Sequence, residues 1–300
     1  GYWRFRLDQN RIEWTDGILG PVSIDAASLS DPVLIRADKQ VLYTFASSVD
    51  DVDMGVSDIV RGADHVTNTA TQIQIIAAMG GRVPAFAHHS LLTGADGEGL
   101  SKRLGALSLR DLRAQGVAKE ALLSMMARLG SSQPVEVRMS LDEIAAGFDL
   151  SQFGAAPTRF DQDDLWPLTR HANQQRPFAE VRGLIAGLGV PEGMAEAFWA
   201  VASHNITKLD ELADWWALIR DGAEPVVVDE DREFVKQALA MLPARPWDGA
   251  TWSVWTNAVK DATGRKGKGL FRPLRLALTG RESGPEMADL MPLLQKTPAV

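Results

Sequence analysis

The stretch between residues 41 and 107 constrains the fold of this chain most, because three short runs there bring charged and flexible residues close together. In one of these runs, residues 58–61 (DIVR) are rich in β-branched side chains and are expected to form a short strand. In an open parallel sheet, ligands bind beyond the carboxyl ends of the strands. Arg61 and Asp64 are therefore expected where a charged ligand would be met.

A glycine-broken loop in the same stretch ends in Ser101, Lys102 and Arg103. Its glycines let backbone amides approach an anion closely, and a lysine there is a mobile charge suited to phosphate. Basic surface loops are common, however. Taken alone, this loop fits a solvated surface better than a phosphate site.

The local patterns predict an α/β part followed by an all-α part. Strands are expected at residues 1–7, 11–15 and 33–36, around Tyr43, and around His88 and His89. Thr69 and Gln72 form a capping-box pattern that is expected to open a helix. Further helices are expected at residues 108–116 and 118–129, from residues 140 and 160, and at 177–188, 191–204, 207–221, 229–242, 249–262, 269–279 and 286–295. Pro167 is expected to disturb the helix that begins near residue 160, and Gly222, Gly264 and Gly280 are expected to end helices.

The composition sets outer bounds on the kind of protein. With 300 residues, 45% of them apolar, the chain can bury a sizeable core and is expected to form two or more domains. It contains no cysteine, which excludes disulfides and thiolate metal sites, and no metal site is expected. No apolar run approaches about 18 residues and no signal peptide opens the chain, so a cytoplasmic protein without membrane contact is expected. The net charge of −8 does not exclude RNA, because RNA affinity depends on local basic surface.

Two other features each allow two interpretations. The basic residues between 265 and 275 could contact phosphate or form a solvated loop, and charge alone favours the loop. Asp50 and Asp51 could hold magnesium or stabilise a turn, with equal weight. The tryptophans at 215, 216, 252 and 255 could stack on bases, but their spacing fits a helical core better.

Taken together, the runs resemble the second half of the catalytic domain of bacterial glutamyl-tRNA synthetases, a family of class I aminoacyl-tRNA synthetases. The likeness rests on residues 43–51 (YTFASSVDD), 54–56 (MGV), 59–65 (IVRGADH) and 86–89 (FAHH). Residues 99–103 (GLSKR) stand in place of the family's Lys-Met-Ser-Lys-Ser signature loop, and residues 273–280 (PLRLALTG) match a late family stretch. The order and spacing of these runs are more specific than any one of them.

The resemblance implies an α/β fold followed by all-α structure, in four parts. Residues 1–40 would end an acceptor-stem insertion, and 41–92 would form the second half of a Rossmann-type catalytic domain. Residues 93–165 would hold the signature loop and a helical connector that contacts the tRNA stem, and 166–300 a helical anticodon-binding domain. The family's first catalytic half has no counterpart in these 300 residues, so the chain by itself is expected to be inactive.

The activity implied is that of a ligase that attaches L-glutamate to tRNA(Glu) through a glutamyl-adenylate made from ATP. The glutamate-binding residues would be Tyr43, Ser47 and Arg61, of which Arg61 would meet a carboxylate through its planar fork. ATP would be contacted by Asp64, the backbone at Leu92 and Lys102. Lys102 would act with Ser101 and Arg103 to stabilise charge on the phosphates.

The resemblance also implies the partners of the chain. Mg²⁺ would accompany ATP, zinc would be absent, and the protein would be a monomer. The tRNA-binding residues would be Arg170, His171, Arg265, Lys266, Lys268, Arg272 and Arg275. Two alternatives are a non-catalytic tRNA-binding fragment and a short paralogue that glutamylates a modified base. The paralogue lacks an anticodon domain, so the long helical part after Trp166 argues against it.

Overall fold

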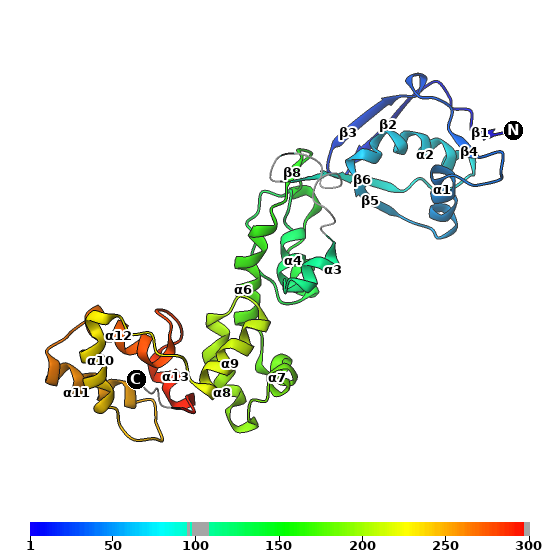
Figure 1. The fold of residues 1–300 in the computed structure, drawn as a ribbon. Coiled ribbons are helices and arrows are strands. Elements are labelled where there is room, and N and C mark those ends of the chain that lie inside the picture. The colour runs from blue at the N-terminus through cyan, green and yellow to red at the C-terminus, as the bar shows by residue number, and fades with distance from the viewer. Residues whose placement is uncertain (95–96, 98–107, 297–300) are drawn as a thin grey trace. The chain divides into compact units, whose positions relative to one another are not determined.

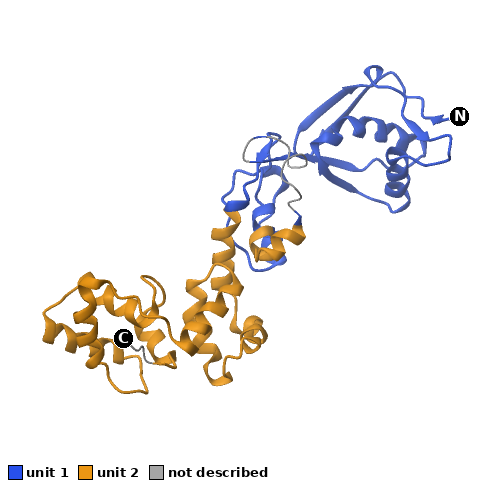
Figure 2. Ribbon diagram, in the orientation of Figure 1, with its two compact units in different colours: residues 1–108, 123–163 blue, residues 109–122, 164–300 orange. Residues whose placement is uncertain are grey.

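The computed structural model describes residues 1–94, 97 and 108–296, and the chain divides into two compact units. Unit 1 contains residues 1–108 and 123–163, and unit 2 contains residues 109–122 and 164–300 (Figure 2). The sheets belong to unit 1, and unit 2 is built from helices. The predicted change from α/β to all-α structure is confirmed.

The main sheet of unit 1 has four strands in the order β3-β2-β6-β5 (Figure 1). β2 (Arg11–Asp16) and β3 (Gly20–Asp25) form an antiparallel hairpin, whereas β5 (Asp58–Gly62) and β6 (Ala85–His89) run parallel. β2 is also parallel to β6, with Asp16 opposite Phe86. The carboxyl ends of β2, β5 and β6 therefore meet at one edge of the sheet.

α2 (Val66–Ala78) connects β5 to β6 and completes the βαβ unit that two parallel neighbours require. Ile75 and Ile76 anchor it in the core of unit 1. The expected helix start at Thr69 is wrong, because the helix already begins at Val66 after a 3₁₀ turn. Thr69 and Gln72 thus lie inside the helix, where their side chains are free for other partners.

α1 (Tyr43–Asp53) corrects the expected strand around Tyr43. The β-branched and aromatic residues at 41–45 favour a strand locally. Phe45, Val49 and Val52, however, recur at helical spacing, and α1 packs against α2. Packing of the apolar residues against a neighbouring helix outweighs local propensity here.

Short elements complete unit 1. β1 (Trp3–Arg4), much shorter than the expected strand at 1–7, pairs with β4 (Val33–Ile35), and β7 (Leu92–Thr93) pairs with β8 (Thr158–Arg159). α5 (Leu141–Ala146) begins as expected after Ser140, whose Oγ accepts a hydrogen bond from the Glu143 amide at 3.2 Å.

Most helices of unit 2 follow the predicted ranges. After α3 (Leu109–Ala114) and the beginning of α4 (Lys119–Met126), which continues into unit 1, they are α6 (Leu165–Gln175), α7 (Phe178–Gly187), α8 (Glu192–Ala202), α9 (Leu212–Asp221), α10 (Arg232–Ala240), α11 (Thr251–Thr263), α12 (Lys268–Thr279) and α13 (Met287–Leu290). The starts expected at residues 160 and 207 are wrong, because 3₁₀ turns at Gln162–Asp164 and Leu209–Glu211 precede the helices that begin at Leu165 and Leu212. Pro167 does not disturb α6, because it lies in the first turn, where its missing N–H has no partner to lose.

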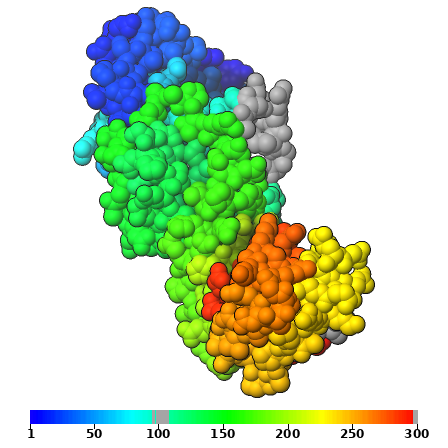
Figure 3. Space-filling model, turned by 90° about the vertical axis from the view of Figure 1, so that its left-hand side faces the viewer, coloured from blue at the N-terminus to red at the C-terminus, as the bar shows by residue number. Residues whose placement is uncertain are grey.

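The core of unit 2 is apolar and mainly aliphatic, with several tryptophan and phenylalanine side chains. Trp215, Trp216 and Trp255 are at most 4% exposed, so the prediction of a helical core is confirmed for these tryptophans. The surfaces of α10 (yellow) and of α11 and α12 (orange) lie against one another in the space-filling view (Figure 3). Gly264 and Gly280 end α11 and α12 with φ of 72° and 65°, as expected for helix stops.

Among the described residues, no single helix is long and apolar enough to cross a membrane; α7 and α8 reach that length only as a pair, which is bent by 115°.

Candidate functional site

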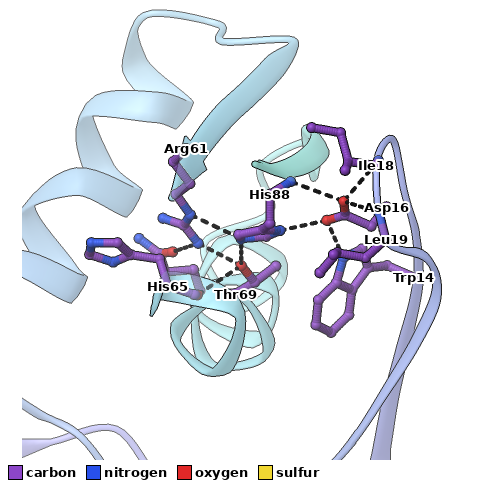
Figure 4. Close-up of polar contacts among 9 residues, drawn as sticks. Trp14, Asp16, Ile18, Leu19, Arg61, His65, Thr69 and His88 are labelled. Carbon is purple, nitrogen blue, oxygen red and sulfur yellow. Dashed lines mark hydrogen bonds and ion pairs between the residues drawn. The ribbon is translucent and has the colours of Figure 1, made fainter. Parts of the chain in front are cut away.

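Three polar side chains meet where β2, β5 and β6 end (Figure 4). Arg61 near the end of β5 lies beside His88 of β6, because these two residues are partners in the parallel register. Asp16 is the last residue of β2, two positions from His88 along that edge. The sheet topology thus brings together residues that are far apart in the sequence.

His88 and Asp16 form a buried pair. The Nδ1 of His88 lies 2.5 Å from Oδ2 of Asp16, and the backbone amide of His88 donates to Oδ1 at 2.9 Å. Both side chains are inaccessible to solvent. Oδ1 also accepts hydrogen bonds from the amides of Ile18 and Leu19, at 3.1 Å each. The carboxylate therefore sits in a cradle of N–H donors.

These donors set the protonation state of Asp16. Burial by itself would raise the pKa of Asp16, but the hydrogen bonds from His88, Leu19 and Ile18 hold it at about 2. The side chain is therefore ionised at neutral pH.

Arg61 is held by α2 as well as by His88. Its Nη2 donates to Oγ1 of Thr69 and to Oε1 of Gln72, each at 2.6 Å, and its Nε lies 3.3 Å from Nε2 of His88. Thr69 and Gln72, the residues expected to cap the helix, are almost fully buried and orient the guanidinium instead. Within the described residues, Nη1 of Arg61 makes no hydrogen bond.

The arrangement changes the way in which Arg61 could meet an anion. Nε and Nη2 are both engaged by protein acceptors, so the expected planar fork of two nitrogens is not free. Nη1, with two N–H donors, remains. In this arrangement Arg61 can meet a carboxylate through Nη1.

The other two predicted glutamate-binding residues lie close to this cluster. Ser47 accepts a hydrogen bond from Nε2 of Gln72 at 2.8 Å, so Gln72 links it to Arg61. Tyr43, one turn earlier on α1, is 53% exposed and its ring lies 5.6 Å from that of His65. Ser47 and Arg61 are thus connected through Gln72, whereas Tyr43 lies beside His65 in the turn before α2.

Asp51, on the last turn of α1, is electrostatically coupled to the cluster. Burial raises the pKa of Asp51, the positive charge of Arg61 opposes this rise, and Asp50 adds to it. Within the described residues, no group of three or more His, Asp or Glu side chains could hold a metal ion.

The predicted ATP-binding residues are only partly described. Asp64 is an exposed residue of the 3₁₀ turn before α2, 3.7 Å from Nε2 of His65, and Leu92 is half-buried in β7. The predictions for Ser101, Lys102 and Arg103 lie outside the described residues.

The predicted tRNA-binding residues differ in how far they are engaged by the protein itself. Arg170 donates to the carbonyl of His204 at 3.3 Å, and His171 is exposed. Arg265 pairs with Asp231 and lies over the ring of Phe234, whereas Lys266 is exposed.

Three further residues of this prediction line one hollow of about 460 Å³ in unit 2. They are Lys268, Arg272 and Arg275, and the wall also contains the aromatic rings of Trp252 and Phe271. Arg272 pairs with Glu282, and Arg275 donates to the Pro285 carbonyl at 2.8 Å. Lys268 at the start of α12 is exposed.

Sequence reasoning missed Asp16, and with it the role of His88. Asp16-Gly17 has the composition of a turn, which explains the omission. The available signal was positional, because Asp16 directly follows the strand predicted at residues 11–15, just as Arg61 ends the one predicted at 58–61.

The match to known families agrees with this architecture. Residues 2–167 match the family described as tRNA synthetases class I (E and Q), catalytic domain, and residues 193–299 match an anticodon binding domain. A glutamate tRNA ligase from Elizabethkingia meningosepticum, solved in complex with its amino acid, has the same fold, with a TM-score of 0.80 at 23% identity. That comparison covers 97% of this chain and 65% of the other. The fold is thus that of a class I synthetase catalytic domain with a helical anticodon domain.

Closer relatives narrow the family further. A "Glutamate--tRNA ligase 1" from Paracoccus denitrificans is 72% identical over 98% of this chain, and a "Glutamate--tRNA ligase 2" from Jannaschia sp. is 68% identical over the whole of it. This chain belongs to the glutamate–tRNA ligase family, which confirms the family and the ligase class expected from the sequence. It spans about two thirds of the length of these relatives, 67% in both cases.

Proposed function

We propose that these 300 residues provide the amino-acid side of a site that joins L-glutamate to tRNA(Glu) through a glutamyl-adenylate. The observation that carries the proposal is Arg61, whose guanidinium is fixed on three sides and leaves Nη1 free within the described residues. A fixed cation with free donors at a strand end suits a substrate carboxylate. Tyr43 and Ser47 complete the glutamate contacts.

In the proposed two-step reaction, the protein mainly positions the reactants and forms no covalent bond with them. The α-carboxylate of glutamate attacks the α-phosphorus of ATP and releases pyrophosphate. A ribose hydroxyl of the tRNA then attacks the carbonyl carbon of the glutamyl-adenylate, forms the ester and releases AMP. Fixed charges lower both barriers by holding the reactants and stabilising the developing charge. ATP enters with Mg²⁺ as the substrate, and Asp64, Leu92 and Lys102, with Ser101 and Arg103, are its proposed contacts.

The tRNA contacts are proposed on unit 2. The exposed Lys266 and Lys268, with Arg170, offer positive charge to the phosphate backbone, and the exposed His171 is a further proposed contact. Arg265, Arg272 and Arg275 support that surface through their bonds to neighbouring residues.

Arg61→Lys in the intact ligase tests the glutamate site. An ammonium cannot reproduce three engaged N–H donors on Nε and Nη2 together with a free third nitrogen, Nη1. The KM for glutamate should therefore rise by about 10- to 100-fold, as expected for a lost charge-assisted bond. Pyrophosphate exchange at varied glutamate and varied ATP measures the two KM values separately. Arg36→Lys, in a surface turn where its Nη1 donates to Gln40, is the matched control. An equal rise in the KM for ATP would show that Arg61 does not belong to the glutamate site.

A further inference from the structure

The buried carboxylate of Asp16 is linked to Arg61 only indirectly, through a third side chain. Asp16 contacts His88, and His88 in turn contacts both Arg61 and its partner Thr69 (Figure 4). We propose that Asp16, acting through His88, is a positioning residue that holds Arg61 with Nη1 directed to the substrate's carboxylate. The inference rests on the glutamate site proposed above and adds the residues that orient it.

The hydrogen-bond partners determine which nitrogen of His88 carries the proton. The ionised carboxylate of Asp16 can only accept, so Nδ1 of His88 must donate across the 2.5 Å contact. The Nε–H of Arg61 can only donate, so Nε2 of His88 must accept. His88 is therefore neutral and protonated on Nδ1, and Asp16 selects that tautomer.

The same contacts make the arrangement stiff. Asp16 is fixed by the backbone amides of Ile18 and Leu19, in the turn between β2 and β3, and by that of His88 in β6. Oγ1 of Thr69 lies 2.9 Å from Nε2 of His88 and 3.2 Å from the carbonyl oxygen of His65, so the Thr69 side chain is also held in one orientation. A guanidinium held by His88, Thr69 and Gln72 loses little further freedom when a ligand binds.

The separation of the Asp16 carboxylate from the Arg61 guanidinium also affects how Arg61 can bind a substrate anion. Asp16 would neutralise Arg61 if the two formed a direct ion pair, and a substrate carboxylate would then have to compete with it. With a neutral imidazole between them, Arg61 makes no ion pair within the described residues. The carboxylate therefore sets the geometry of the guanidinium while its positive charge stays available to an anion.

Asp16→Asn tests this inference because it is nearly isosteric. The asparagine Oδ1 can still accept from the amides, but its Nδ2 is a donor and would face Nδ1 of His88. His88 should then move its proton to Nε2, which places an N–H against the Nε–H of Arg61. The expected result is a glutamate KM about 10- to 100-fold higher, with the ATP KM within about twofold of wild type.

The tautomer can be read directly by ¹⁵N NMR of the imidazoles in the ¹⁵N-labelled chain. The chain has five histidines, and His88→Asn identifies the signal of interest by its loss. Wild type should show a protonated Nδ1 and Asp16→Asn a protonated Nε2. An unchanged tautomer in Asp16→Asn, or equal rises in both KM values, would overturn the proposal.

Two further variants protect the test against misfolding. His88→Asn keeps an N–H donor toward Asp16 but removes the acceptor that Nε2 offers Arg61, and it should give the same glutamate-specific defect. Asp25→Asn is the matched control, because its Oδ1 accepts a single amide bond, from Ala27 at 3.1 Å, on the exposed β3. Asp25→Asn should leave both KM values unchanged, and a defect equal to that of Asp16→Asn would count against the proposal.

The outcome for Arg61→Lys separates this inference from the proposed function. If Arg61→Lys leaves the glutamate KM unchanged while Asp16→Asn still switches the tautomer, the glutamate assignment fails and the link between Asp16 and His88 stands. If Arg61→Lys is glutamate-specific and Asp16→Asn is silent in both readouts, the positioning role fails and the glutamate site stands.

Discussion

Single residues in this site depend on one another for their charge. Asp16 stays ionised in the protein interior because three backbone amides and His88 donate to it. His88 in turn lies between that carboxylate and the guanidinium of Arg61. Removing any one of these donors or acceptors leaves a buried polar group unpaired, which costs about 1–3 kcal/mol. The cluster is thus sensitive both to substitution and to pH.

The lowered pKa of Asp16 predicts a pH-dependent contribution to stability. The hydrogen bonds, led by that from His88, outweigh burial and bring the pKa from 3.8 to about 2 in the folded protein. Because the folded value is the lower one, the contribution is complete above about pH 4 and is lost as the pH falls to about 2. At about 1.4 kcal/mol per pKa unit, it amounts to about 2 kcal/mol.

Urea denaturation of wild type and Asp16→Asn between about pH 5 and pH 2 measures this contribution. The difference in free energy of unfolding between the two proteins should shrink by about 2 kcal/mol toward the acid end. Asp25→Asn serves again as the control with one exposed carboxylate removed. A difference between wild type and Asp16→Asn that stays constant with pH would contradict the assignment.

Whole elements explain how far the fold and the site could be predicted from the sequence. Strand β5 and the helices of unit 2 follow their patterns, because turn residues and apolar periodicity specify them locally. α1 was missed because Tyr43, Thr44 and Phe45 favour a strand, and only packing against α2 makes them helical. The position of Arg61 near the end of a strand was predicted from the local pattern and is confirmed, whereas its role stays a prediction. The contact between Asp16 and His88 depends on a pairing across 72 residues that no local pattern reveals.

The ends of helices offer a test at the scale of an element. Gly280 ends α12 with φ of 65°, and an added Cβ would lie 3.2 Å from the backbone carbonyl oxygen of Glu224. Gly280→Ala should lower the free energy of unfolding by about 1–3 kcal/mol, through strain in the left-handed region and this close contact.

Gly183→Ala is the matched control, because Gly183 lies inside α7 with open space around its Cβ position. It should raise the free energy of unfolding by up to about 1 kcal/mol. Thermal or urea denaturation compares the two variants. Equal effects of the same sign would show that the conformation of Gly280 carries no strain.

The basic residues near the C-terminal end of the chain differ in whether they are already paired with carboxylates. The chain has a net charge of −8, yet five basic residues lie between positions 265 and 275. Arg265 forms a partly buried ion pair with Asp231, and Arg272 forms an exposed one with Glu282. Exposed pairs add little stability, but both pairs occupy the positive charge of the arginine. The lysines at 266 and 268 are exposed, so they are the more available partners for phosphate.

This difference predicts the salt dependence of tRNA binding, on the basis of the proposed function. Each phosphate contact contributes about 0.7 to 0.9 to the slope of log affinity against log salt, because a bound counterion is released. Replacing both Lys266 and Lys268 by Ala should therefore lower that slope by about 1.4 to 1.8.

The control replaces Lys236 and Lys260, exposed lysines on α10 and α11, and removes the same net charge. Fluorescence anisotropy with labelled tRNA(Glu) over a range of salt concentrations measures both slopes. If the two double variants lose the same slope, net charge and not the position of the lysines governs binding, and the proposed contact at residues 266 and 268 is wrong.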